Sequence, residues 1–256
     1  MQEGVGKRAA IIWGLTIFLL LNLIGSVRAE SVTLKLNPAV VEINSFYQGC
    51  EVAITGTIPA GHEAVAEIVG PTGEEILMRK GRRGPLWMNV GELKISGAPS
   101  LYLILASASD LLTGAASWGF GAMRQRITVA GQVPAGQEDK LRDQFLRLKE
   151  SEELYAEVPE GLKVLPAKDG RLSVTGSFWL PANVKPDTYT VCLMAVAGDR
   201  LVERQCMALS VKMVGFPALF MSLAYQHSVI YGVLAVVIAI LTGFIMGHLF
   251  KGGGGH

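Results

Sequence analysis

The sequence predicts a mainly β fold: an immunoglobulin-like antiparallel sandwich with a helical insertion, followed by one C-terminal transmembrane helix. Three observations lead to this prediction. Apolar and polar residues alternate with a period of two, with turn residues between them, in 31–107 and again in 171–212. A stretch with helical spacing of apolar residues separates these two regions. An uncharged apolar run at 229–250 is long enough to cross a bilayer.

The N-terminus has the pattern of a secretory signal peptide. Lys7 and Arg8 precede an apolar stretch, and Val27 and Ala29 occupy the −3 and −1 positions of a cleavage site. No cysteine follows that site, which argues against a lipid-modified N-terminus. An uncleaved anchor is the alternative. We expect residues 1–29 to be removed and the rest to be exported to an oxidising compartment.

Residues 30–214 are predicted to form the periplasmic β-sandwich, with the helical insertion at about 110–157. The run from Leu101 to Ser107 is continuously apolar, which favours a central strand. Within the insertion, residues 138–155 carry Leu141, Phe145 and Leu148 at helical spacing and are predicted to pack as an amphipathic helix on the sheet. Two separate small sandwiches are the alternative to a single one.

The last part of this domain is predicted to be a long hairpin of residues 189–196 and 201–211. It begins with the run Pro-Asp-Thr-Tyr-Thr-Val, in which the tyrosine is Tyr189. This run is similar to the corner of immunoglobulin-like sandwiches, where a tyrosine hydroxyl returns a hydrogen bond to the backbone.

The C-terminal apolar run at 229–250 carries no Asp, Glu, Lys or Arg, so we predict a transmembrane helix. An amphipathic juxtamembrane segment at 215–228 precedes it, and a short cytoplasmic tail at 251–256 follows. The signal peptide fixes the orientation, and Lys251 agrees with it. The predicted location is the bacterial inner membrane, as a single-pass protein with its N-terminal side outside and the soluble domain in the periplasm.

One face of this helix carries small residues at every fourth position: Ala235, Ala239, Gly243 and Gly247. Such a pattern lets two helix backbones approach closely in lipid. It predicts a helix-packing face for self-association or for an integral membrane partner. The alternative is that glycine and alanine are simply common in membrane spans.

The only dense basic run contains Arg79, Lys80, Arg82 and Arg83. Arginine offers bidentate contacts to oxyanions, so this run is a weak candidate for binding sulfite, sulfate or a lipid phosphate. The alternative, which we favour, is the solvated end of a hairpin.

Two of the three cysteines lie on adjacent predicted strands. A three-residue hairpin loop would place Cys192 opposite Cys206 and allow a disulfide, whereas a two-residue loop would place Cys192 opposite Gln205. We leave both possibilities open. Cys50 is expected to be a small buried hydrophobe.

The same hairpin suggests a soft-metal site formed by Cys192, Met194, Cys206 and Met207. Alternation places Met207 on the face opposite Cys206, and no histidine joins the group, so we predict no metal and no cofactor. No constellation of acid, base and nucleophile is visible, so we do not expect an enzyme. The net charge of +1 argues against nucleic-acid binding.

Several segments together resemble the alpha-proteobacterial family of single-span membrane proteins named Alph_Pro_TM. The matching segments lie at 41–49, 69–71, 79–89, 147–155, 180–184, 188–191 and 214–232. The resemblance spans nearly the whole mature chain, although Cys192 and Cys206 do not belong to the family pattern. It implies an exported protein with one C-terminal span, in a family often associated with exporters of sulfite or organosulfonates.

The expected function is therefore that of a membrane-anchored periplasmic accessory or assembly protein that partners a membrane transporter. The export of sulfite or organosulfonates is implied only by the resemblance. The alternative is a periplasmic carrier that binds an anion or a soft metal.

Overall fold

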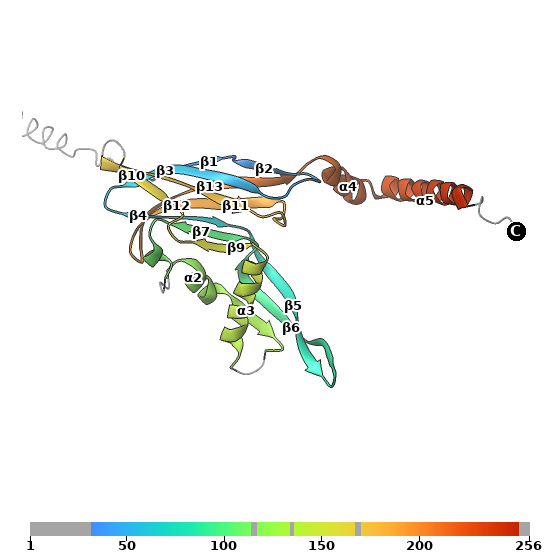
Figure 1. Cartoon of the computed structure of the whole chain (residues 1–256), viewed down its shortest axis with the longest axis horizontal. Coiled ribbons are helices and arrows are strands. Elements are labelled where there is room, and N and C mark those ends of the chain that lie inside the picture. Colours follow the sequence, from blue (N-terminus) through green and yellow to red (C-terminus); the bar gives the residue numbers. More distant parts are fainter. Residues whose placement is uncertain (1–31, 114–116, 134–135, 167–169, 251–256) are drawn as a thin grey trace, which may run out of the picture. The chain divides into compact units, whose positions relative to one another are not determined.

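The computed structural model describes residues 32–113, 117–133, 136–166 and 170–250. The predicted signal peptide at 1–29 and tail at 251–256 lie outside the described residues. The predicted mainly β fold with one C-terminal apolar helix is confirmed (Figure 1).

Two sheets form the sandwich. The first has four antiparallel strands in the order β1 (Thr33–Asn37), β3 (Cys50–Pro59), β11 (Arg171–Leu180) and β10 (Lys163–Pro166). The second has six strands in the order β2 (Val40–Ile43), β13 (Arg200–Met213), β12 (Asp187–Ala197), β4 (Glu63–Val69), β7 (Tyr102–Ala106) and β9 (Tyr155–Val158). Because β3 pairs with β11 and β4 pairs with β12, the early and late halves of the chain share both sheets.

Both edges of the six-stranded sheet depart from a purely antiparallel arrangement. At one edge β2 runs parallel to β13, with Val40 opposite Ser210. At the other edge β9 runs parallel to β7, with Tyr102 opposite Tyr155. A parallel neighbour requires a long crossover connection, and the helical insertion supplies one between β7 and β9.

The main core lies between the two sheets, where alternate residues of each strand point inward. On β4 and β12 the inward residues are Ala64, Ala66, Ile68, Val191, Leu193 and Ala195, and on β3 and β11 they include Val52, Ile54, Val174 and Phe178. The sheets approach closely at Gly56. A Cβ built there would lie 2.5 Å from Leu193 Cδ2 and 2.1 Å from the Thr33 carbonyl oxygen, so only glycine fits without a shift of the backbone.

A second core covers the other face of the six-stranded sheet. It is closed by a three-stranded sheet, β5 (Thr72–Arg83), β6 (Leu86–Pro99) and β8 (Thr128–Gly131), and by the helices η1 (Ser109–Leu111), α2 (Gly119–Arg126) and α3 (Glu138–Ser151). All five residues of β7 are buried, because this strand contributes to both cores. The prediction of a central apolar strand is thus confirmed.

The insertion at about 110–157 contains more than helices. Besides α2 and α3 it includes β8 and β9, which add to two different sheets. The amphipathic helix α3 buries Leu141 and Phe145 as predicted, but Leu148 is 38% exposed and Lys149 is buried in the neighbouring position. The apolar periodicity predicted burial at Leu148 rather than at Lys149. Lys149 can be buried because ion pairs neutralise its charge, and the spacing of apolar residues does not reveal those ion pairs.

The predicted tyrosine corner is present at the start of β12. The Tyr189 hydroxyl donates a hydrogen bond to the Lys185 carbonyl oxygen at 2.7 Å. The Tyr189 ring is buried in the main core, so this bond fixes the connection that enters β12.

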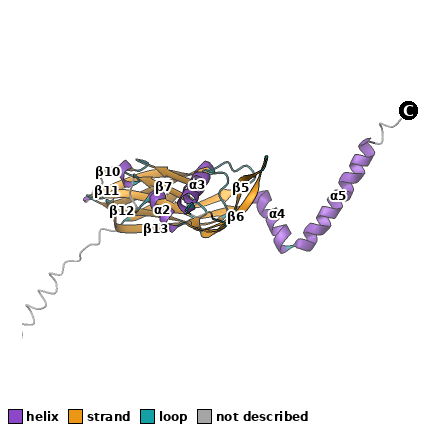
Figure 2. Cartoon of the chain, turned by 90° about the horizontal axis from the view of Figure 1, so that it is seen from below, coloured by secondary structure: helices purple, strands orange, loops and turns teal. Residues whose placement is uncertain are grey.

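After β13 the chain continues into two helices, α4 (Gly215–Gln226) and α5 (Ser228–Phe250), which Figure 2 distinguishes from the strands by colour. His227 separates them. The amide of Val214 donates to the Ile43 carbonyl at 2.8 Å and extends the pairing of β2 with β13 up to the start of α4.

Candidate functional site

The helix α5 is the one described helix that is long and apolar enough to cross a membrane. It spans 23 residues, Ser228–Phe250, and at about 1.5 Å per residue it covers the hydrocarbon core of a bilayer. Its side chains are exposed on every side of the helix. Such a surface is stable only in lipid or against other apolar helices.

The small residues of α5 divide into two pairs. Ala235 and Ala239 line a groove of about 570 Å³ between α4 and α5, together with Leu219, Phe220, Leu223, Tyr231, Leu234 and Ile238. Gly243 and Gly247 lie beyond that groove, and a Cβ built on either would meet nothing within 4 Å. The glycine pair therefore offers an open surface on which the backbone of another helix can approach closely.

The helix α4 occupies most of the predicted juxtamembrane segment. The rings of Phe216 and Phe220 contact each other with centroids 4.5 Å apart and planes inclined by 54°, and both side chains are exposed. Neither turn at the ends of α4 carries a charged side chain. This apolar helix continues the lipid-compatible surface of α5 toward the sandwich.

The predicted basic run lies at the end of the β5–β6 hairpin. Strand alternation places Arg79 and Arg83 on one face and Lys80 and Arg82 on the other. The four side chains consequently do not converge on one small anion. The favoured prediction of a hairpin end is consistent with the exposure of Lys80, Arg82 and Arg83.

Sequence reasoning missed the apolar half of this hairpin end. Leu86 and Trp87 are 66% and 73% exposed, and Met88 is exposed beside them. Arg82 lies opposite Trp87, and Arg83 lies opposite Leu86. A tryptophan and a leucine directly after an Arg-Arg-Gly-Pro turn were the available signal, but their exposure is a tertiary property that the sequence pattern does not give.

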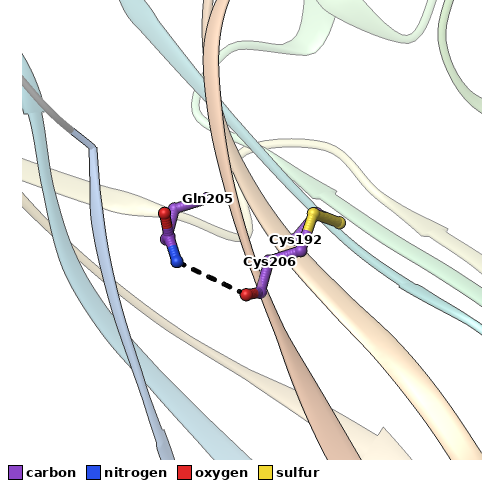
Figure 3. Close-up of a disulfide and its surroundings, with 3 residues drawn as sticks. All are labelled: Cys192, Gln205 and Cys206. Atoms are coloured by element: carbon purple, nitrogen blue, oxygen red, sulfur yellow. Dashed lines mark hydrogen bonds between the residues drawn. A yellow bond between two sulfur atoms is a disulfide. The ribbon is translucent and has the colours of Figure 1, made fainter.

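A disulfide joins Cys192 on β12 to Cys206 on β13 (Figure 3). Neither simple loop length explains it. The turn at Gly198 and Asp199 has two residues, with Ala197 opposite Arg200, but Val202 is an extra residue that shifts the register. This bulge places Cys192 opposite Cys206, with Cα atoms 4.1 Å apart.

The disulfide changes the soft-metal hypothesis. Both cysteine sulfurs are bonded to each other, so neither is a thiolate that could ligate Cu(I). Met194 is buried in the second core, and Met207 lies on the opposite face of its strand from Cys206. The four sulfur atoms do not form one site. Cys50 is half-buried against the main core and accepts a weak bond from the Tyr47 hydroxyl at 3.6 Å.

Two glutamates lie in the cross-strand row that contains the disulfide. Glu67 on β4 is opposite Cys192, and Glu157 on β9 is opposite Ile104 of β7. Burial raises the pKa of the Glu67 carboxyl, and the nearby guanidinium groups of Arg126 and Arg204 oppose that rise. Burial also raises the pKa of Glu157, whose carboxylate accepts the amide of Phe120 in the first turn of α2. Glu157 thus holds α2 against the sheet.

A buried lysine joins α3 to the base of the β5–β6 hairpin. The Lys149 ammonium lies 2.8 Å from Glu75 Oε1 and 3.3 Å from Glu152 Oε2, and 5.5 Å from the centre of the Phe145 ring. A cleft of about 500 Å³ opens beside this group and is lined by further polar residues, including Asn183, Lys185 and Asp187. Because both carboxylates are satisfied by Lys149, the cluster is best explained as a structural brace.

The comparisons with known proteins agree with a membrane location. No curated protein matches the chain. The family described as "Putative transmembrane protein (Alph_Pro_TM)" matches residues 31–252, which include the sandwich, the helical insertion, α4 and α5. That match covers nearly the whole sequence, and the chain therefore belongs to the Alph_Pro_TM family of transmembrane proteins.

Proposed function

We propose that this protein is a non-enzymatic accessory or assembly factor, with an immunoglobulin-like ectodomain held in the periplasm and α5 crossing the bacterial inner membrane with its C-terminus inside. The family and the apolar helix support membrane embedding. The sandwich with its tyrosine corner supports the immunoglobulin-like description. The disulfide supports an oxidising compartment.

The observation that carries the proposed role is the open glycine pair on α5. Gly243 and Gly247 have free space where side chains would be, whereas Ala235 and Ala239 border the groove against α4. In lipid, helices associate through close backbone packing rather than through the hydrophobic effect. We infer that the glycine pair packs against a helix of an integral membrane partner or of a second copy.

A transporter is the partner class that we propose. The role in sulfite or organosulfonate export is supported only by the resemblance of this chain to a family associated with such exporters. The basic hairpin residues do not form a convergent anion site, so the transported anion is proposed to be handled by the partner.

The partner is tested by crosslinking the full chain in native membranes and identifying what is captured. Gly243→Leu with Gly247→Leu should abolish the crosslinked species, because the added side chains separate the helices. The matched control is Leu241→Phe with Ile245→Phe, which adds bulk on the opposite side of α5. Recovery of only the monomer from the wild-type chain would contradict the proposal.

The orientation is tested separately with a reporter fused after the last residue. A reporter that is active only in the cytoplasm should be active in this fusion. Activity of a periplasm-specific reporter instead would overturn the proposed topology.

A further inference from the structure

The end of the β5–β6 hairpin is an exposed arm with no covering element among the described residues. All eight residues from Arg82 to Asn89 are exposed. The third strand of this sheet, β8, pairs with β6 only over Leu93–Ser96, near the base. The arm is therefore two-stranded beyond that point (Figure 1).

Basic and large apolar side chains share both faces of this arm. One face carries Ile76, Met78, Lys80, Arg82 and Trp87, and the other face carries Arg83, Leu86 and Met88 near the turn. Exposed aromatic and aliphatic side chains beside arginines are unfavourable in water, but they suit the interface of a membrane.

Strand register places the start of this arm at the end of the sandwich from which the membrane helix departs. Val211, close to the end of β13, lies opposite Asp187 at the beginning of β12. Thr190 of β12 then lies opposite Val69, the last residue of β4. The arm begins three residues after Val69, at Thr72. The chain leaves β4 for the arm and β13 for α4 at the same end of the six-stranded sheet.

The arm is longer than the part of β13 that leads from the same level of the sheet to α4. Val69 and Ala208 lie at the same level of the sheet, because both pair with Thr190. From that level, the chain continues through β5 for fourteen residues to Arg83, whereas β13 continues for only five residues to Met213. At about 3.3 Å per residue, the fourteen residues span about 46 Å and the five span about 17 Å, so an arm inclined by less than about 70° to β13 is long enough to reach the level at which β13 ends.

A second exposed aromatic lies at the same end. Phe46 is 89% exposed, in the connection that follows β2. The carbonyl of Ile43, at the end of β2, accepts the amide of Val214 just before α4. Phe46 thus follows Ile43 by only three residues, and the hydrogen bond between Ile43 and Val214 lies where β13 ends and α4 begins.

We propose that the tip of the β5–β6 hairpin, through Arg82, Arg83, Leu86 and Trp87, docks on the anionic phospholipid surface of the leaflet that faces the sandwich. Leu86 and Trp87 enter the headgroup region, and the two guanidinium groups bind lipid phosphates. A bilayer fits better than a single soluble anion, because the basic side chains point to both faces of the hairpin. The docking rests on the membrane insertion of α5 and is independent of the partner that α5 binds.

The test uses the full chain reconstituted in vesicles of two parts brominated phosphatidylcholine to one part phosphatidylglycerol. The chain has four tryptophans, so the fluorescence of Trp87 is obtained by subtracting the emission of the Trp87→Phe variant from that of the wild type. Bromine in the acyl chains should quench this difference signal, and each of Arg82→Glu and Arg83→Glu should weaken the partition of the tip about fivefold or more. Vesicles without phosphatidylglycerol should show correspondingly less quenching.

The matched control moves the tryptophan to the far end of the sandwich. Leu165 is 62% exposed and pairs with Ser173, near the beginning of β11, whereas the end of β11 leads into the connection to β12. In a Trp87→Phe, Leu165→Trp chain the new tryptophan should not be quenched. Equal quenching at positions 87 and 165, or no quenching at position 87, would overturn the proposal.

A photoreactive residue at position 86 separates lipid from protein in native membranes. Adducts whose mass matches a phospholipid support docking on the bilayer. Adducts to another protein or to a second copy would assign the arm to a protein interface and overturn the lipid proposal.

Discussion

Two long hairpins of this chain are built alike and have opposite environments. β5–β6 turns at Gly84 with φ +62°, and β12–β13 turns at Gly198 with φ +59°. Each has two turn residues, and each contains a bulge, at Val90 and at Val202 respectively. Yet β12 lies between β13 and β4 and is buried from Val191 to Val196, whereas the end of β5–β6 is exposed on both faces. Both turns contain a glycine with positive φ, so the difference in burial must come from the residues between the turn and the base of each hairpin.

The comparison shows how a hairpin becomes a core element or an arm. The six residues from Val191 to Val196 supply apolar side chains to both faces, so two cores can form on β12. The outer part of β5–β6 has charged residues on both faces, which would be costly to bury.

The largest contrast should come from removing one leucine from each hairpin. Leu193→Ala should cost about 2–5 kcal/mol of unfolding free energy, because it leaves a cavity between the sheets. Leu86→Ala should change it by no more than about 0.5 kcal/mol, because the side chain is exposed. Urea unfolding of the full chain in detergent, followed by the β-sheet circular dichroism signal, measures both. Similar losses in the two variants would contradict the distinction.

The disulfide is the covalent difference between the hairpins. Cys192→Ser with Cys206→Ser should lower the unfolding free energy by about 2–4 kcal/mol, since an open unfolded chain gains conformational freedom. Chemical reduction of the wild type should give a comparable loss. Cys50→Ser serves as the control, because Cys50 is a free thiol. A stable double variant with an unchanged urea midpoint would show that β12–β13 needs no covalent support.

The base of β5–β6 depends on the brace to α3. Lys149→Met should lower the free energy of unfolding by about 1–3 kcal/mol, because Glu75 and Glu152 lose their cation. Both carboxylates are partly exposed, so the loss should be smaller than for a fully buried ion pair. Lys140→Met on the exposed side of the same helix should be nearly neutral. Proteolysis near residues 75–80 should increase only in the Lys149 variant.

The two turns should respond equally to the same substitution. Gly84→Ala and Gly198→Ala should each cost about 1 kcal/mol, because both glycines have positive φ and neither has a neighbour that would clash with a Cβ. Gly73→Ala, where φ is not in the left-handed region and space is also free, should lack this cost. Unequal effects at Gly84 and Gly198 would show that the surroundings contribute to the turns.

The smallest effect concerns pH and the neighbourhood of β12. Folding raises the pKa of Glu67 above the ordinary value, so the folded state holds this proton more tightly than the unfolded state. Its contribution to stability is therefore present below about pH 4.3 and is lost as the pH rises through the folded pKa. The urea midpoint of the wild type should therefore fall between acidic and neutral pH, and Glu67→Gln should remove the part of this fall that comes from Glu67. An unchanged slope would exclude Glu67 as its source.

Much of this architecture follows from local patterns in the sequence. Alternation locates most strands of the sandwich, the continuous run at 101–107 marks a strand that is buried on both faces, and the corner of Tyr189 is recognisable from the run Pro-Asp-Thr-Tyr-Thr-Val. The apolar run at 229–250 is predictable because length and composition alone determine whether a helix can span a bilayer.

The remaining features depend on distant contacts. The bulge at Val202 sets the pairing of the two cysteines, and no turn rule predicts it from the hairpin sequence. The burial of Lys149 depends on Glu75, which lies 74 residues away. The parallel pairing of β9 depends on where the insertion returns to the sheet. The exposed surface at Trp87 could not be predicted for the same reason, because the exposure of a side chain depends on whether distant parts of the chain pack over it.

The hydrogen bonds along β13 also have a mechanical consequence. This strand joins the membrane helices directly, and it is paired on one side with β12 over most of its length and on the other side with β2. A pull on β13 that acts along the strand axis would load both rows of hydrogen bonds together. The connection to α4 therefore leaves the sandwich from a strand that has a neighbour on each side, so the apolar helices follow a strand that is held in the sheet by two rows of bonds.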